Sequence, residues 1–180
     1  MWYMFYSATA FNQPLEAWDV GQVTSMYFMF SSASAYNQPL EAWNVAKISN
    51  MGGLFYYAIS FNQPLNVWNV AKVTNLHSTF REAFAFNQPL AGWDVAKVGS
   101  MFATFTSAGA FNQDISQWNV SKVTSMGSML GGTDSLADDA LSSSESVASL
   151  TSSKSFHSRQ SAQTQSASCG WSDSFVPTAG

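Results

Sequence analysis

The chain repeats itself every 25 residues, with no insertion or deletion between one unit and the next. An aromatic residue marks the period in five successive units: Phe11, Tyr36, Phe61, Phe86 and Phe111. A unit of this size cannot bury its own apolar side chains, but three or more stacked units share a continuous core. The sequence therefore predicts a repeat protein made of stacked 25-residue coils, in which most invariant residues serve the stack.

The first half of each unit predicts a short strand. Leu15, Trp18 and Val20 give the pattern L-x-x-W-x-V, in which Trp and Val alternate as they do on one face of a strand. Both residue types also have high strand propensity. We expect the strands of successive units to lie parallel, with their Trp side chains in the core.

The second half of each unit predicts a short helix. Its apolar residues follow one another at steps of three, four and three positions: Val23, Met26, Phe30 and Ala33. This is the helical period, and Thr24 stands where a hydroxyl caps the first free backbone amides. Gly99 replaces it in the fourth unit, so we expect the fourth helix to be the most weakly capped. The expected fold is an α/β repeat.

The repeated phrase FNQPLxxWDVxxVTxMxxMF resembles the 25- to 26-residue repeat of BspA-like leucine-rich repeat surface proteins. The resemblance covers residues 1–130. It implies a right-handed leucine-rich-repeat-like solenoid and a surface or adhesion role, at the cell surface or outside the cell. Val23 stands where leucine-rich repeats carry their ladder asparagine, so Asn12 and its equivalents are expected to form that ladder instead.

The two ends of the chain depart from the regular repeat. Met1–Ala10 aligns with Met26–Ala35, so the chain opens with half a unit before the five full ones. We therefore expect a fragment of a longer protein, whose uncapped first edge could associate end to end with another copy. Residues 131–180 contain fifteen serines and lose the period, which predicts a Ser-rich C-terminal cap or a partly disordered tail.

Composition argues against several classes of function. The chain has only seven Lys and Arg residues, spread singly, so no basic cluster favours nucleic acid. No apolar run is long enough for a transmembrane helix, and Cys169 is the single cysteine, so neither structural zinc nor another cofactor is expected. His77 and His157 are the only histidines, and no nucleophile and base recur together, which predicts that the protein is not an enzyme.

Polar residues on the outward side of the predicted strand are candidates for binding a ligand. If Trp and Val point inward, their neighbours point to solvent and can vary from unit to unit. The candidate binding residues are Glu16, Asp19, Glu41, Asn44, Asn66, Asn69, Asp94, Ser116 and Asn119. The Asp19 position could equally be kept for turn formation, and neutral drift also produces variation. A second variable surface is expected on the helix, at Tyr27, Gly52, His77, Phe102 and Gly127.

Two invariant columns have both a structural and a binding interpretation. The Trp column could stack on a sugar or a base, but its alternation with Val favours the core. The Asn-Gln pair that begins with Asn12 and Gln13 could be a polar ligand array, but an Asn repeated within a turn usually bonds backbone groups. We expect both columns to be structural.

These observations favour a non-enzymatic surface or secreted module that binds a protein or a glycan through one face of the solenoid. One alternative is a structural spacer domain of a larger surface protein. Another is a binder of ice or crystal surfaces, which is weakened by the lack of a uniform Thr ladder on the outward positions.

Overall fold

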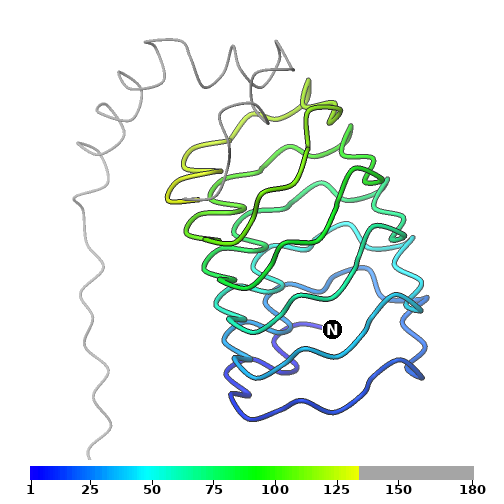
Figure 1. The fold of residues 1–180 in the computed structure, drawn as a ribbon. Coiled ribbons are helices and arrows are strands. Elements are labelled where there is room, and N and C mark those ends of the chain that lie inside the picture. The colour runs from blue at the N-terminus through cyan, green and yellow to red at the C-terminus, as the bar shows by residue number, and fades with distance from the viewer. Residues whose placement is uncertain (134–180) are drawn as a thin grey trace, which may run out of the picture.

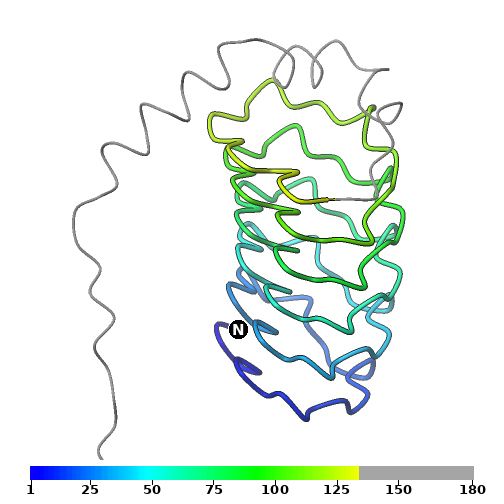
Figure 2. The same ribbon diagram turned by 60° about the vertical axis from the view of Figure 1, so that its left-hand side comes forward.

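The protein is a stack of coils. The computed structural model describes residues 1–133, which wind into successive coils that lie one upon another (Figure 1, Figure 2). Many hydrogen bonds join residues 24 to 28 positions apart, so each coil is bonded to its neighbours. The period of the sequence is therefore the period of the stack. No helix in this part of the chain is long and apolar enough to cross a membrane.

The expected α/β repeat, with one short parallel strand and one short helix per coil, is wrong. Residues 1–133 contain no helix and no extended strand. Strand-like pairing is limited to one isolated parallel bridge between neighbouring coils: Ser25 with Asn50, Asn50 with Asn75, Asn75 with Ser100, and Ser100 with Ser125. A right-handed leucine-rich-repeat-like solenoid therefore does not describe this protein, whose coils are built of turns.

The region expected to be helical is a run of tight turns, which we call the turn segment. It comprises residues 1–8, 26–33, 51–58, 76–83, 101–108 and 126–133. In residues 26–33 the even-numbered N–H groups donate to carbonyls of the next coil, at 2.7–3.0 Å. The N–H groups of Met29, Ser31 and Ala33 donate instead to the carbonyl three residues earlier, at 3.0–3.3 Å. An α-helix would need bonds to the carbonyl four residues earlier.

Left-handed residues interrupt every turn segment. Phe28 and Ser32 have φ values of 51° and 58°, and each is the third residue of a turn. A type II turn requires positive φ at that residue, and an L side chain there costs about 1–2 kcal/mol. The same two positions are left-handed in the other coils, at Tyr3, Ser7, Gly53, Tyr57, Ser78, Glu82, Ala103, Ser107, Ser128 and Gly132. A helix cannot pass through either position.

The apolar pattern nevertheless identified the inward-facing residues of the turn segment. Met26, Met29, Phe30 and Ala33 are fully buried. Their spacing is that of one helix face, because successive four-residue turns return the chain to the same side about as often as helical turns do. Periodicity alone cannot separate these two conformations.

The Thr24 column does not cap helices but joins coils. The N–H and Oγ of Ser49 both donate to the Thr24 carbonyl, at 2.9 and 3.2 Å. Thr74 and Thr124 make the same pair of bonds to the coils before them. Gly99 keeps the N–H bond, at 2.9 Å, but has no hydroxyl. The predicted weak helix cap at Gly99 is therefore wrong, and what Gly99 lacks is a bond between coils.

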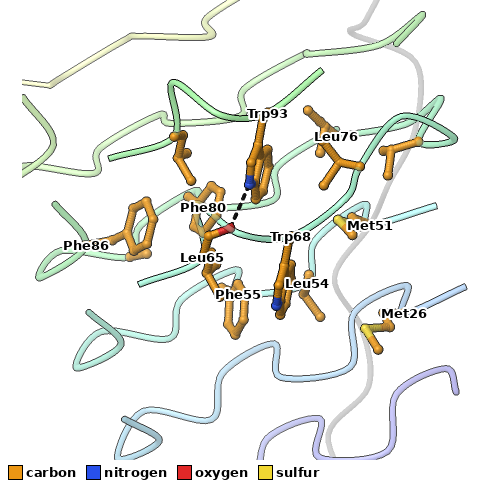
Figure 3. Packing of buried hydrophobic residues seen from close by; sticks show 14 of the residues in the cluster. Met26, Met51, Leu54, Phe55, Leu65, Trp68, Leu76, Phe80, Phe86 and Trp93 are labelled. Atoms are coloured by element: carbon orange, nitrogen blue, oxygen red, sulfur yellow. Dashed lines mark hydrogen bonds between the residues drawn. The ribbon is translucent and has the colours of Figure 1, made fainter. Parts of the chain in front are cut away.

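The expected strand is also a turn, although its Trp lies in the core as predicted. The Trp93 N–H donates to the Leu90 carbonyl at 3.0 Å, so Leu and Trp face the same side. The Trp93 indole N–H then donates to the Leu65 carbonyl of the preceding coil at 2.9 Å (Figure 3). Equivalent indole bonds are made by Trp43, Trp68 and Trp118. Trp18, in the first coil, is 40% exposed.

Aromatic rings form two parallel columns through the core. Within one coil Phe55 and Phe61 stack with ring centroids 3.9 Å apart, and Phe80 and Phe86 stack at 4.1 Å. Between coils Phe55 stacks on Phe80 at 5.7 Å. Tyr36 occupies a phenylalanine position, and its hydroxyl is buried without a hydrogen-bond partner in the described chain. Burial, and to a lesser degree the charge of Glu16, raises the pKa of Tyr36.

The Asn12 column forms a ladder that bonds one coil to the next, as predicted. The Asn62 Oδ1 accepts the Asn87 N–H at 2.9 Å and the Gln88 Nε2 at 3.1 Å. The same arrangement recurs on Asn12, Asn37 and Asn87. The Asn-Gln pairs are therefore structural.

The first ten residues follow the repeat as expected, whereas most of the predicted tail cannot be compared. The N–H groups of Tyr3, Phe5 and Ser7 donate to carbonyls of the second turn segment at 2.8–3.2 Å, so Met1–Ala10 has the register of Met26–Ala35. The predicted cap or Ser-rich tail, residues 131–180, falls almost wholly in 134–180, outside the described residues.

Replacing Tyr36 with Phe should stabilise the protein. The substitution removes a buried hydroxyl that has no partner, so we expect the free energy of unfolding to rise by about 1 kcal/mol in urea denaturation. Phe61→Tyr, in the same column, is the matched control and should lower it by about 1–3 kcal/mol. A loss of stability in Tyr36→Phe would contradict this assignment.

Replacing Gly53 with Ala should destabilise the protein by about 2 kcal/mol. Gly53 has φ of +62°, and a Cβ there would lie 2.6 Å from the Phe28 ring. Gly109→Ala is the control, because a Cβ at Gly109 meets nothing within 4 Å. Thermal unfolding of both variants measures the difference, and equal melting temperatures would refute the prediction.

Removing one rung of the Asn ladder should weaken the stack. Asn62→Ala leaves the Asn87 N–H without its acceptor and the Gln88 amide with only the Asn62 backbone carbonyl, so a loss of about 1–3 kcal/mol in urea denaturation is expected. Asn69→Ala removes an exposed bond within a single coil and should cost about 0.5 kcal/mol. The prediction fails if Asn69→Ala is the more damaging change.

Candidate functional site

The nine candidate binding residues lie on the outer side of the coils, in the turns between the core Leu and Val. Eight of them are exposed and Ser116 is half-buried. The Asp19 Oδ1 accepts the Gly21 N–H at 2.9 Å, and four equivalent residues make the same bond at 3.1–3.2 Å: Asn44, Asn69, Asp94 and Asn119. The turn-forming interpretation of this column is therefore confirmed, and a ligand is not needed to explain it.

Two more of the candidates also have structural partners. The Asn66 Oδ1 accepts the Gly92 N–H of the next coil at 2.7 Å, and a Cβ at Gly92 would lie 2.7 Å from the Asn66 carbonyl. The Ser116 N–H donates to the Asp114 Oδ1 at 2.8 Å. Hydrogen bonds from the Ser116 side chain and backbone lower the pKa of Asp114.

Glu16 and Glu41 complete the candidate set as exposed carboxylates on neighbouring coils. Their equivalents in the later coils are Asn66, Ala91 and Ser116, so the charge is confined to one end of the described stack. A binding role for this face stays a prediction.

A different surface, on the turn segments and the residue that follows one of them, Phe84, carries the largest exposed aromatic side chains. Trp2 is 69% exposed, and Tyr3, Tyr6, Tyr57 and Phe84 are between 42% and 52% exposed. Six rings are in continuous contact and form what we call the aromatic strip: Tyr6, Tyr3, Phe28, Tyr56, Tyr57 and Phe84. Consecutive ring centroids are 5.5–6.4 Å apart. The strip crosses four coils.

Glycines of the next coil make room for rings of the strip and its surroundings. A Cβ at Gly53 would lie 2.6 Å from the Phe28 ring, and one at Gly52 would lie 3.1 Å from the Tyr27 ring. A Cβ at Gly127 would likewise lie 3.1–3.2 Å from the Phe102 ring. These glycines stand at positions whose residue type varies between units. The shape of this surface can therefore differ from unit to unit without any change in the residues that build the core.

The charged residues next to the strip are already paired. The Arg81 Nε lies 3.2 Å from the Glu82 Oε1, and the Arg81 guanidinium lies over the Tyr56 ring at 5.6 Å. The pKa of Tyr3 is raised, chiefly by desolvation and further by Tyr27 and Tyr6. The charges near the strip are thus the Arg81–Glu82 pair and the Met1 α-ammonium, which donates to the Ser25 carbonyl at 2.8 Å.

A cavity of about 360 Å³ adjoins the strip and is lined by Trp2, Tyr3, Tyr27 and Asn50. The Asn50 Oδ1 accepts the Gly52 N–H at 2.9 Å and the Asn75 Nδ2 at 3.1 Å, which fixes the amide. The Asn50 Nδ2 donates no hydrogen bond within the described chain. The cavity therefore combines aromatic walls with one oriented amide donor.

His77 and Ser78 do not have the geometry of a catalytic pair. The Ser78 Oγ lies 3.4 and 3.5 Å from the two ring nitrogens of His77, longer than the roughly 2.6–3.2 Å of an activated nucleophile. Ser78 is 3% exposed, and the His77 Nδ1 lies 3.3 Å from the Phe102 carbonyl. His77 also stacks on the Phe102 ring.

The sequence interpretation identified part of this surface. Tyr27, His77 and Phe102 belong to the variable column predicted from the sequence, but this column lies on turns and not on a helix. Tyr3, Tyr6, Tyr57 and Phe84 were not among the predicted surface residues. The available signal was the accumulation of aromatic residues at positions that the repeat leaves free.

Comparison with known proteins corrects the family expected from the repeat. No BspA-like or leucine-rich repeat family matches, so the resemblance to those surface proteins was wrong. No curated protein and no solved structure matches the chain. A family model described as "Mycoplasma protein of unknown function, DUF285" matches residues 1–91 and again residues 64–170. These two overlapping matches cover most of the sequence, and the chain therefore belongs to the DUF285 family.

Proposed function

We propose that this protein is a non-enzymatic interaction module whose stacked coils form a rigid frame and whose ligand binds on the turn segments. The observation that carries the proposal is the aromatic strip, a series of touching rings that crosses four coils and of which four are about half exposed. Large exposed apolar surfaces are uncommon on soluble proteins unless they bind something.

The contrast between frame and strip supports this proposal. The frame residues recur in nearly every unit because they fill the core or bond one coil to the next. Positions on the strip differ between units: the third residue of the turn segment is Tyr3, Phe28, Gly53, Ser78 and Ala103 in successive coils. Variation on a fixed frame is how a repeat protein acquires a specific binding surface.

A structural spacer remains the alternative function, because a regular bonded stack would also serve as a spacer. A spacer needs no exposed aromatic rings, whereas Trp2, Tyr6 and Phe84 are among the most exposed large hydrophobic side chains of residues 1–133. The proposed surface or extracellular location had rested on the leucine-rich repeat resemblance. The binding proposal does not depend on it.

The test compares two faces of the same protein. The full chain is screened by biolayer interferometry against panels of purified glycans and extracellular proteins. Ligands are then retested with Trp2→Ala/Tyr57→Ala on the turn segments and Glu16→Lys/Glu41→Lys on the outer face. We expect a ligand whose affinity falls about tenfold or more in the aromatic variant and little in the charge-reversed one. The opposite ranking, or no ligand at all, would count against the proposal.

A further inference from the structure

We infer that a second surface of the protein, a column of lysines along the stack, binds an acidic polysaccharide that carries one carboxylate on each sugar. The lysine column is formed by the third residue of the same turn in four successive coils: Lys47, Lys72, Lys97 and Lys122. None of these residues belongs to the aromatic strip, so the inference goes beyond the proposed function and does not depend on it.

The fold gathers lysines that lie far apart in the sequence. Each lysine is exposed and follows the one before it by 25 residues, which is the period of the stack. Two residues further along each coil, the Thr74 N–H donates to the Ser49 carbonyl at 2.8 Å, and the Gly99 N–H donates to the Thr74 carbonyl at 2.9 Å. Chain segments paired by such bonds lie about 4.8 Å apart. The lysines therefore follow one another along the stack at nearly this interval.

The turn itself does not require lysine. In the first coil Gln22 takes the lysine position, and the Val23 N–H closes the turn at 2.9 Å, as the Ile48 N–H does around Lys47. The Lys47 Nζ donates to the Gln22 Oε1 at 2.6 Å, so side chains of neighbouring coils in this column are close enough to touch. Lysines on neighbouring coils repel one another, and a bound polyanion would relieve that repulsion.

The lysine column holds every lysine and arginine of the described chain except one. The exception, Arg81, is paired with Glu82 at 3.2 Å, and this is the only salt bridge among the described residues. Glu41, Asp94 and Asp114 share coils with lysines of the column but form no salt bridge with them. The column is thus a line of positive charge on a chain whose net charge is −4. Charge complementarity favours an anionic ligand with evenly repeated charges.

A column of hydroxyl groups runs beside the lysines. Lys72 and Thr74 are exposed and flank Val73, which is buried. The hydroxyl groups of Ser49, Thr74 and Thr124 each donate to a carbonyl of the preceding coil, at 3.1–3.2 Å. A hydroxyl group has a single hydrogen, so these oxygens can only accept a hydrogen bond from a ligand. Each of these coils therefore offers one ammonium donor and one hydroxyl acceptor.

The two columns match the chemistry of a polyuronate, a linear chain of uronic acid sugars. Each sugar carries one carboxylate, which an ammonium group can bind, and hydroxyl groups, which can donate to a threonine oxygen. The length of one sugar is comparable to the spacing of the coils, so successive sugars can meet successive coils. A nucleic acid fits less well, because its phosphates donate no hydrogen bond and neither column contains an aromatic residue on which bases could stack.

The experiment measures binding of the full 180-residue chain to immobilised polygalacturonate by biolayer interferometry. The methyl ester of polygalacturonate is the matched neutral ligand. Polyphosphate and single-stranded oligothymidylate are the comparison anions that lack carboxylates. We expect polygalacturonate to bind most tightly and its methyl ester to bind about tenfold more weakly or not at all. Added salt should weaken the binding, because the lysines are exposed.

Variants separate the lysine column from the rest of the charge. Lys72→Gln and Lys97→Gln should each weaken polygalacturonate binding about three- to tenfold. Arg81→Gln removes one positive charge outside the column and should change the affinity by less than about twofold. Gln22→Lys lengthens the column and should tighten binding about two- to threefold. Thr74→Val removes a hydroxyl acceptor and should weaken the binding of polygalacturonate but not that of polyphosphate.

Thermal unfolding shows whether each variant is folded, and Gln22→Lys gives a second reading if a glutamine variant is not. The inference is overturned if polygalacturonate does not bind, if its methyl ester binds equally well, or if Arg81→Gln acts as strongly as Lys97→Gln. Tighter binding of polyphosphate or the oligonucleotide would also overturn it. If Trp2→Ala/Tyr57→Ala abolishes polygalacturonate binding, the ligand lies on the turn segments, so the proposed function stands and the lysine-column inference fails.

Discussion

The structure depends on how buried backbone N–H groups find acceptors in residues 1–133, which contain neither a helix nor a sheet. Unpaired N–H groups in a core cost about as much as a lost hydrogen bond, so nearly all must be satisfied. In residues 26–33 alternate N–H groups close local turns and the others bond to the next coil. Each coil is therefore completed only by its neighbour. This requirement disfavours insertions in the turn segments, because one extra residue there would exchange the two kinds of donor.

The conformational cost of this arrangement is offset by the core. Within residues 1–133 ten residues other than glycine have positive φ, all of them at the two left-handed positions of the turn segments. The turns bring Phe, Met and Ala side chains inward at each level, where Phe55, Phe80 and Phe105 stack at 5.5–5.7 Å. The Trp indole bond and the Asn-Gln ladder then connect the same levels on the other sides of the coil.

The sequence predicted which residues face inward better than it predicted the conformation that turns them inward. The period, the buried Trp column and the structural Asn12 ladder followed from comparing units with one another. The predicted helix was wrong because consecutive turns also bury residues at helical spacing. The predicted strand was wrong because the turn from Leu90 to Trp93 also points both side chains inward. Positive φ at Phe28 and Ser78 has no sequence signal, since glycine takes that position only at Gly53.

The aromatic strip was difficult to predict for a related reason. Its members come from different columns of the repeat, so they meet only when the pitch and the turn geometry are known. Phe28 contacts Tyr56, and Tyr57 contacts Phe84, although neither pair is 25 residues apart. Aromatic residues at variable positions indicate a surface of interest, but their order along the stack depends on the coordinates.

The hydrogen bonds between coils run in opposite directions on different sides of the stack. N–H groups of the turn segments donate to the next coil toward the C-terminus. The Asn ladder, the Trp indoles and the Thr24 column donate to the preceding coil, toward the N-terminus. Peptide and side-chain dipoles on one side therefore oppose those on the other. An α-helix of similar length would build up a macrodipole with partial charges at its two ends. A stack of this kind can be lengthened by further coils with little increase in field along its axis.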